Sequence, residues 1–159
     1  MPPTNIVMSK PSKQQKSAEL QRQHIERSHQ FAAEWFAKHE ATCLVPLERG
    51  ERPTVIEWRK PSDSNYAMTF FIWRNRVIVT GDVGDAVYAW PCSELTIEQL
   101  ATFDWHYFAG KCVASETWRD YTQKIPGVAA PVCNIRAIAH FVGLQMAIKQ
   151  LSQKTAQPA

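Results

Sequence analysis

The chain has 159 residues, of which 45% are hydrophobic and 21% charged, so global disorder is excluded and one domain with a single core is expected. The net charge is +3, and residues 1–29 account for it with five Lys or Arg against two Glu. The remaining chain has 13 basic and 13 acidic residues, which argues against a basic nucleic-acid surface on the folded part.

The four cysteines are scattered without CxxC spacing, and a protein of this size folds without disulfides. We therefore expect free thiols that are buried as structural residues. The sequence also lacks an uninterrupted apolar run of about 18 residues and an early signal-peptide core. A soluble protein of the cytoplasm that does not enter a membrane is expected. The cysteines are Cys43, Cys92, Cys112 and Cys133.

The N-terminal part divides into a tail and a helix. Residues 1–15 combine Pro, Ser, Lys and Gln and predict a mobile basic tail, followed by a single α+β domain over 16–153 and a disordered end at 154–159. Residues 17–39 repeat apolar positions at helical spacing, which predicts a helix that covers one sheet face. Its apolar stripe is Ile25, Ala32, Trp35, Phe36 and His39.

Two strands are predicted next. Residues 42–47 form a short candidate strand that ends at Pro46, and residues 54–60 alternate as a half-exposed strand should, with Ile56 and Trp58 on one face. The run 61–65 consists of turn-forming residues and predicts a loop.

The stretch 66–90 reads as three sequential antiparallel strands and forms the centre of the predicted sheet. Its β-branched and aromatic residues are interrupted by Arg74-Asn75 and by the Gly81–Asp85 turn. Both parities of its first strand are largely apolar, which predicts a central strand covered on both faces. These two sets are Met68, Phe70 and Ile72, and Ala67, Phe71 and Trp73.

Helices follow the strands. Thr96 and Gln99 fit a capping box, so a short helix should start at Thr96, and a second should start near Asp104 with Trp105, Phe108 and Cys112 on its apolar face. Residues 134–153 are apolar over much of a helical circumference and predict a buried final helix. The predicted fold is α+β, with an antiparallel sheet of four or five strands packed by N-terminal, middle and C-terminal helices.

Asp82 and Asp85 are the sharpest candidates for chemistry. Two carboxylates on a glycine-containing loop could hold Mg²⁺ in a nuclease-like enzyme. The alternative is a tight turn in which glycines supply positive φ and the Asp side chains accept backbone amides. We favour the turn, because it explains every residue without a ligand. No common catalytic signature occurs, so no catalytic residue, metal or cofactor is predicted.

The remaining candidates are aromatic and arginine side chains of the central strands. Stacking of nucleic-acid bases on them is one use, helped by the basic N-terminal segment. A protein-binding surface is the use we favour, because exposed Trp, Tyr and Arg are typical of protein interfaces. The predicted partner-binding residues are Trp73, Arg74, Arg76, Tyr88 and Trp90.

The run RVIVTGDVGDAVYAW and the following segment FDWHYFAGKCVASE resemble a group of small accessory proteins encoded by bacteriophages and prophages. The shared features are a strand ending in TGD, a glycine, an Ala-Val-aromatic strand and an aromatic helix ending in Lys-Cys. The resemblance covers residues 66–116 and implies a viral origin more than an activity. Phage proteins of this size without catalytic signatures often bind and block a host protein, as anti-CRISPR inhibitors do.

The leading hypothesis is therefore a non-enzymatic, phage-encoded binding protein that acts in the host cytoplasm. Its partner would be a host protein or ribonucleoprotein complex, such as a CRISPR-Cas defence complex, blocked by steric occlusion. The alternatives are a metal-dependent enzyme that uses Asp82 and Asp85, and a nucleic-acid-binding module. The oligomeric state stays open.

Overall fold

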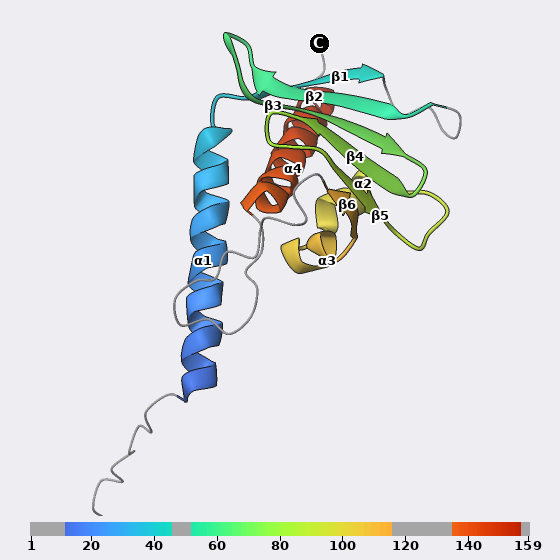
Figure 1. The fold of residues 1–159 in the computed structure, drawn as a ribbon. Helices are drawn as coiled ribbons and strands as arrows, with labels where there is room; N and C mark the ends of the chain where they lie inside the picture. Colours follow the sequence, from blue (N-terminus) through green and yellow to red (C-terminus); the bar gives the residue numbers. More distant parts are fainter. Residues whose placement is uncertain (1–11, 46–51, 116–134, 157–159) are drawn as a thin grey trace, which may run out of the picture.

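The computed structural model describes residues 12–45, 52–115 and 135–156. They form a six-stranded antiparallel sheet and four helices, which confirms the α+β class with a strand more than predicted. The order of strands in the sheet is their order in the chain, so the sheet is a simple meander (Figure 1). The strands are β1 (Glu40–Val45), β2 (Thr54–Lys60), β3 (Asp63–Trp73), β4 (Arg76–Gly81), β5 (Ala86–Ala89) and β6 (Cys112–Ser115).

The helices lie together on one side of the sheet (Figure 1). They are α1 (Lys13–Trp35), α2 (Ile97–Thr102), α3 (Trp105–Ala109) and α4 (Ile135–Ala156). The sheet face toward the helices is called the inner face, and the opposite one the outer face. Strand alternation sends every second side chain inward, and in the middle of the sheet most of these inward side chains are almost fully buried. They include Ile56, Trp58, Met68, Phe70, Val77, Val79 and Tyr88.

α1 begins earlier than predicted. Ser12 accepts the Gln15 amide at 3.2 Å and Gln15 bonds back to the Ser12 amide at 2.8 Å, which makes a capping box and places Lys13–Gln15 in the helix. The rest of the predicted tail lies outside the described residues. The predicted helix end at residue 39 is wrong, because α1 ends at Trp35. The stripe residues Ala32, Phe36 and His39 are nevertheless buried, as expected.

α4 is the central helix of the core and confirms the prediction of a buried final helix. Its middle turns, from Ile138 to Leu144, are buried all round between the sheet and α1. Two of its polar residues bind the backbone at the start of β1. Gln150 donates to the His39 carbonyl at 2.9 Å and accepts from the Ala41 amide at 3.0 Å. Lys154 donates to the Ala41 carbonyl at 3.1 Å, so part of the β1 edge is already occupied.

The short helices begin where the sequence indicates. Thr96 accepts the Gln99 amide at 3.1 Å in the predicted capping box, and Asp104 accepts the Tyr107 amide at 2.8 Å. Cys112, however, was expected on the apolar face of α3 and instead starts β6. β6 pairs with β5 and is the additional strand that was not predicted.

Two further expectations are wrong. The predicted loop 61–65 is only a two-residue turn, because β3 already starts at Asp63 and Lys60 pairs with Asp63 across the hairpin. The cysteines were expected to be buried, but Cys43 and Cys92 are exposed and Cys112 is half-buried, all three as free thiols. Cys133 lies outside the described residues.

Candidate functional site

The outer face of β3 does not have the cover that the sequence predicts. Ala67, Thr69 and Phe71 are half-buried there and Trp73 is 43% exposed, whereas the inner-face neighbours Met68 and Phe70 are at 1% and 0%. The expectation of a strand covered on both faces is therefore wrong for the described residues. All helices in the described part of the chain lie on the inner side, so none of them covers the outer face (Figure 1).

An apolar row crosses the outer face at right angles to the strands. Strand register places its members directly opposite one another on adjacent strands. The row spans four inter-strand spacings, or roughly 19 Å at about 4.8 Å each. Its side chains shield one another only in part, so they remain accessible to a partner. The row consists of Val55, Phe71, Ile78, Val87 and Ala114.

The two flanks of the apolar row differ in charge. One flank carries Thr69 and Thr80 with Glu57, whose carboxylate is paired with Arg59 at 3.5 Å. The other flank begins at the β3–β4 hairpin, where Trp73 lies opposite Arg76. The face is therefore nearly neutral on one side and basic on the other.

The basic flank contains three of the five predicted partner-binding residues, Trp73, Arg74 and Arg76, and all three are exposed. The Arg74 guanidinium lies 5.0 Å from the centre of the Trp73 ring, a cation–π arrangement. In the described part of the chain neither arginine forms an ion pair with a carboxylate. We call these three residues the arginine flank.

Arg74 has an unusual backbone. Its φ of 52° places it in the left-handed region, at the first of two hairpin-turn residues, where glycine is preferred. The turn is held in place because the Arg74 carbonyl accepts the Leu95 amide at 2.7 Å and Asn75 donates to the Trp90 carbonyl at 2.7 Å. An arginine in this position costs on the order of 1 kcal/mol relative to glycine.

Tyr88 and Trp90 do not belong to this surface, which corrects the prediction of an exposed position for them. They are 0% and 3% exposed, because Tyr88 shares the inward parity of Val77 and Trp90 packs on Phe103. The β5 alternation, in which Val87 and Ala89 take the outer side, is the signal that could have separated them.

The Gly81–Asp85 turn is structural, as the favoured interpretation predicts. Gly81 and Gly84 have φ of 131° and 96°, and a Cβ on Gly81 would collide with the Ala67 carbonyl oxygen. The Asp82 carboxylate accepts the Ala67 amide at 3.2 Å, and the Asp85 carboxylate accepts the Gly81 amide at 3.3 Å. Both carboxylates thus close the turn.

The sequence did not reveal that His140 ties this turn to α4. Its Nε2 lies 3.0 Å from the Gly84 carbonyl oxygen and its Nδ1 lies 3.0 Å from the Tyr88 hydroxyl. Since a carbonyl only accepts, Nε2 carries the proton and Nδ1 accepts from Tyr88. Burial lowers the pKa of His140 to about 4, against the opposing effect of the hydrogen bond to Gly84. His140 is a neutral structural bridge at neutral pH.

Enzyme chemistry gains no support from the described residues, among which no three His, Cys, Asp or Glu side chains could hold a metal ion together. The alternative that uses Asp82 and Asp85 as metal ligands therefore stays a prediction that nothing here favours. No helix in the described ranges is long and apolar enough to cross a membrane.

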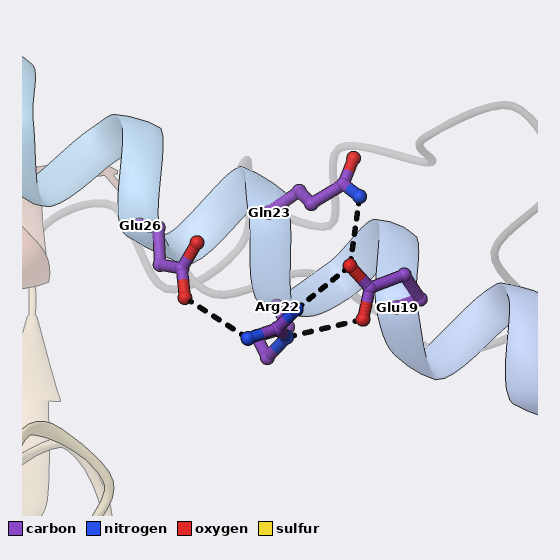
Figure 2. Close-up of polar contacts among 4 residues, drawn as sticks. All are labelled: Glu19, Arg22, Gln23 and Glu26. Carbon is purple, nitrogen blue, oxygen red and sulfur yellow. Dashed lines mark hydrogen bonds and ion pairs between the residues drawn. The ribbon is translucent and has the colours of Figure 1, made fainter.

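The basic N-terminal segment offers less free charge than the sequence suggests. Figure 2 shows Arg22 between two carboxylates on the surface of α1, at 2.8 Å from Glu19 and 3.4 Å from Glu26. Gln23 adds a hydrogen bond to Glu19 at 2.8 Å. These exposed pairs contribute little to stability, but they neutralise one of the cations that a nucleic acid would need.

Comparison with protein-family models, with curated proteins and with solved structures gives no match to this chain. The outer face is therefore assigned as the candidate site on its geometry alone.

Proposed function

We propose that this protein is a non-enzymatic binding protein whose outer sheet face occupies the surface of a host macromolecular target and blocks it sterically. The single observation that carries this proposal is an apolar row that no described helix covers, beside an exposed Trp and two arginines that form no ion pair with a described carboxylate. Apolar side chains with Trp and Arg anchors are what stable protein interfaces use. A neutral or wholly polar outer face would be the norm for a sheet that binds nothing.

The kind of target follows from the resemblance of residues 66–116 to phage accessory proteins. A bacterial defence complex such as CRISPR-Cas is the target that this origin favours. The chain is not strongly acidic, so the proposed mode is occlusion of a protein surface and not imitation of DNA by charge.

The test is affinity capture from a lysate of a defence-expressing bacterial strain with three forms of the protein. Wild type should recover a stoichiometric partner, and Ile78→Asp, which places a charge in the middle of the apolar row, should not. The matched control is Phe31→Asp, which changes a 54% exposed aromatic residue on α1, and it should capture as wild type does. Equal capture by wild type and Ile78→Asp would refute the outer face as the binding surface.

A further inference from the structure

We infer that the partner of the outer face is an acidic, amphipathic protein segment whose carboxylates meet the arginine flank. The inference rests on the proposed function, because it concerns the occupant of the same face. The partner segment would have an apolar strip that contacts the apolar row, and it would carry negative charge on only one side of that strip.

The charge asymmetry of the face carries the first step. Arg74 and Arg76 lie on one flank without a described carboxylate partner, while Arg59 on the other flank is already paired with Glu57. Desolvating an unpaired guanidinium at an interface is unfavourable, so a partner must supply the missing acceptors. Carboxylates on the opposite flank would meet threonines and an occupied Arg59, and would gain less.

The geometry of Arg74 carries the second step. Its guanidinium carbon lies 5.0 Å from the centre of the Trp73 ring, a cation–π contact that uses the face of the guanidinium and not its N–H donors. A planar guanidinium held in this way suits bidentate binding of a carboxylate. The strained φ of 52° indicates that the arginine is kept at a cost, where glycine would be preferred.

The row decides between a protein and other occupants. Val55, Ile78 and Val87 are aliphatic, so they have no donor or positive charge that could bind the phosphate backbone of a nucleic acid. The nonpolar side chains of a protein segment, in contrast, would cover them and remove their surface from water. A helix of about 13 residues spans the roughly 19 Å of the row. A second copy of the chain is disfavoured, because Glu57, the carboxylate beside the row among the described residues, is already paired with Arg59.

The experiment selects binders from a displayed library of random peptides of about 16 residues, with full-length wild-type protein as bait and Ile78→Asp as the counter-selection bait. Expected winners combine aliphatic residues with net negative charge. Their affinity should fall about tenfold or more for the double variant Arg74→Glu, Arg76→Glu, and should fall with rising salt. Changing the acidic residues of a winning peptide to Lys should restore binding to that double variant, which also shows that the variant is folded.

The remaining outcomes are decisive as well. Neutral or basic winners that still depend on Ile78 would overturn the acidic partner and leave the proposed function standing. No winner that distinguishes wild type from Ile78→Asp would overturn both. Binding of a labelled oligothymidine that requires Arg74 and Arg76 would replace the protein partner by nucleic acid. Self-association of wild type that Ile78→Asp abolishes, measured by analytical ultracentrifugation, would replace it by a second copy.

Discussion

The inner and outer faces of the sheet carry β-branched and aromatic side chains in similar density, but the helices of the described ranges cover only the inner face. Phe70 and Phe71 are neighbours in β3, yet Phe70 is 0% exposed in the core and Phe71 is half-buried in the apolar row of the outer face. Apolar character alone therefore does not distinguish a core position from an interaction surface. What distinguishes them is the element that lies above each face.

The largest expected effect is on the free energy of unfolding, when Phe70 and Phe71 are each replaced by alanine in separate variants. Phe70→Ala should lower the free energy of unfolding by about 3–5 kcal/mol, because it leaves a cavity in the core. Phe71→Ala should lower it by only about 1 kcal/mol, because its ring is already partly in water. Urea denaturation followed by circular dichroism measures both. Equal losses would mean that the outer face is covered after all.

Acid should weaken the inner face through His140. Because burial depresses the pKa of His140 from 6.5 to about 4, the stabilising neutral form is fully present above pH 6.5 and is lost as the pH falls toward 4. The loss should reach roughly 3 kcal/mol near pH 4, at 1.36 kcal/mol per unit of pKa shift.

This loss is measured by denaturation at a series of pH values. His29 and His39 also have lowered pKa values, mainly through burial, and act in the same direction. The contribution of His140 is the part of the pH dependence of the free energy of unfolding, between pH 6.5 and 4, that is lost in the His140→Gln variant. An unchanged slope in that variant would contradict the assignment.

The smallest expected effect on stability separates strain from binding at the arginine flank. Arg74→Gly relieves the positive φ but adds backbone entropy to the unfolded chain, so the free energy of unfolding should change by less than about 1 kcal/mol. Binding of the captured partner should nevertheless weaken. The matched control is Arg22→Gln, which removes an arginine from the surface of α1 and should leave binding unchanged. Gln is chosen at this position because Gly would destabilise the helix. A destabilised Arg74→Gly protein would show that Arg74 serves the fold.

Most of the fold could be predicted from local patterns. The alternation of apolar residues in β2 predicted that Ile56 and Trp58 face inward, and the capping box at Thr96 predicted the start of α2. Both patterns could be recognised because each lies within a few consecutive residues. β6 was missed because its four residues become a strand only by pairing with β5 across α2 and α3. Asp63 has a turn composition, but the hairpin with β2 decides its conformation.

The candidate site was predicted only in part. Trp73, Arg74 and Arg76 were selected for the right chemistry, but Tyr88 and Trp90 were selected with them because aromatic residues suit a core and an interface equally well. The His140 bridge could not be found, because it joins residues more than 50 positions apart and no local pattern connects them.

The position of α4 in the chain has a consequence for synthesis. All six strands of the described ranges precede it, and each pairs with its neighbour in sequence, so the meander can form while the chain is still emerging from the ribosome. Until α4 has left the exit tunnel, the inner face lacks its main cover and the nascent sheet presents two apolar surfaces. A chaperone that recognises exposed hydrophobic residues should therefore bind this protein during translation, and release it once α4 docks.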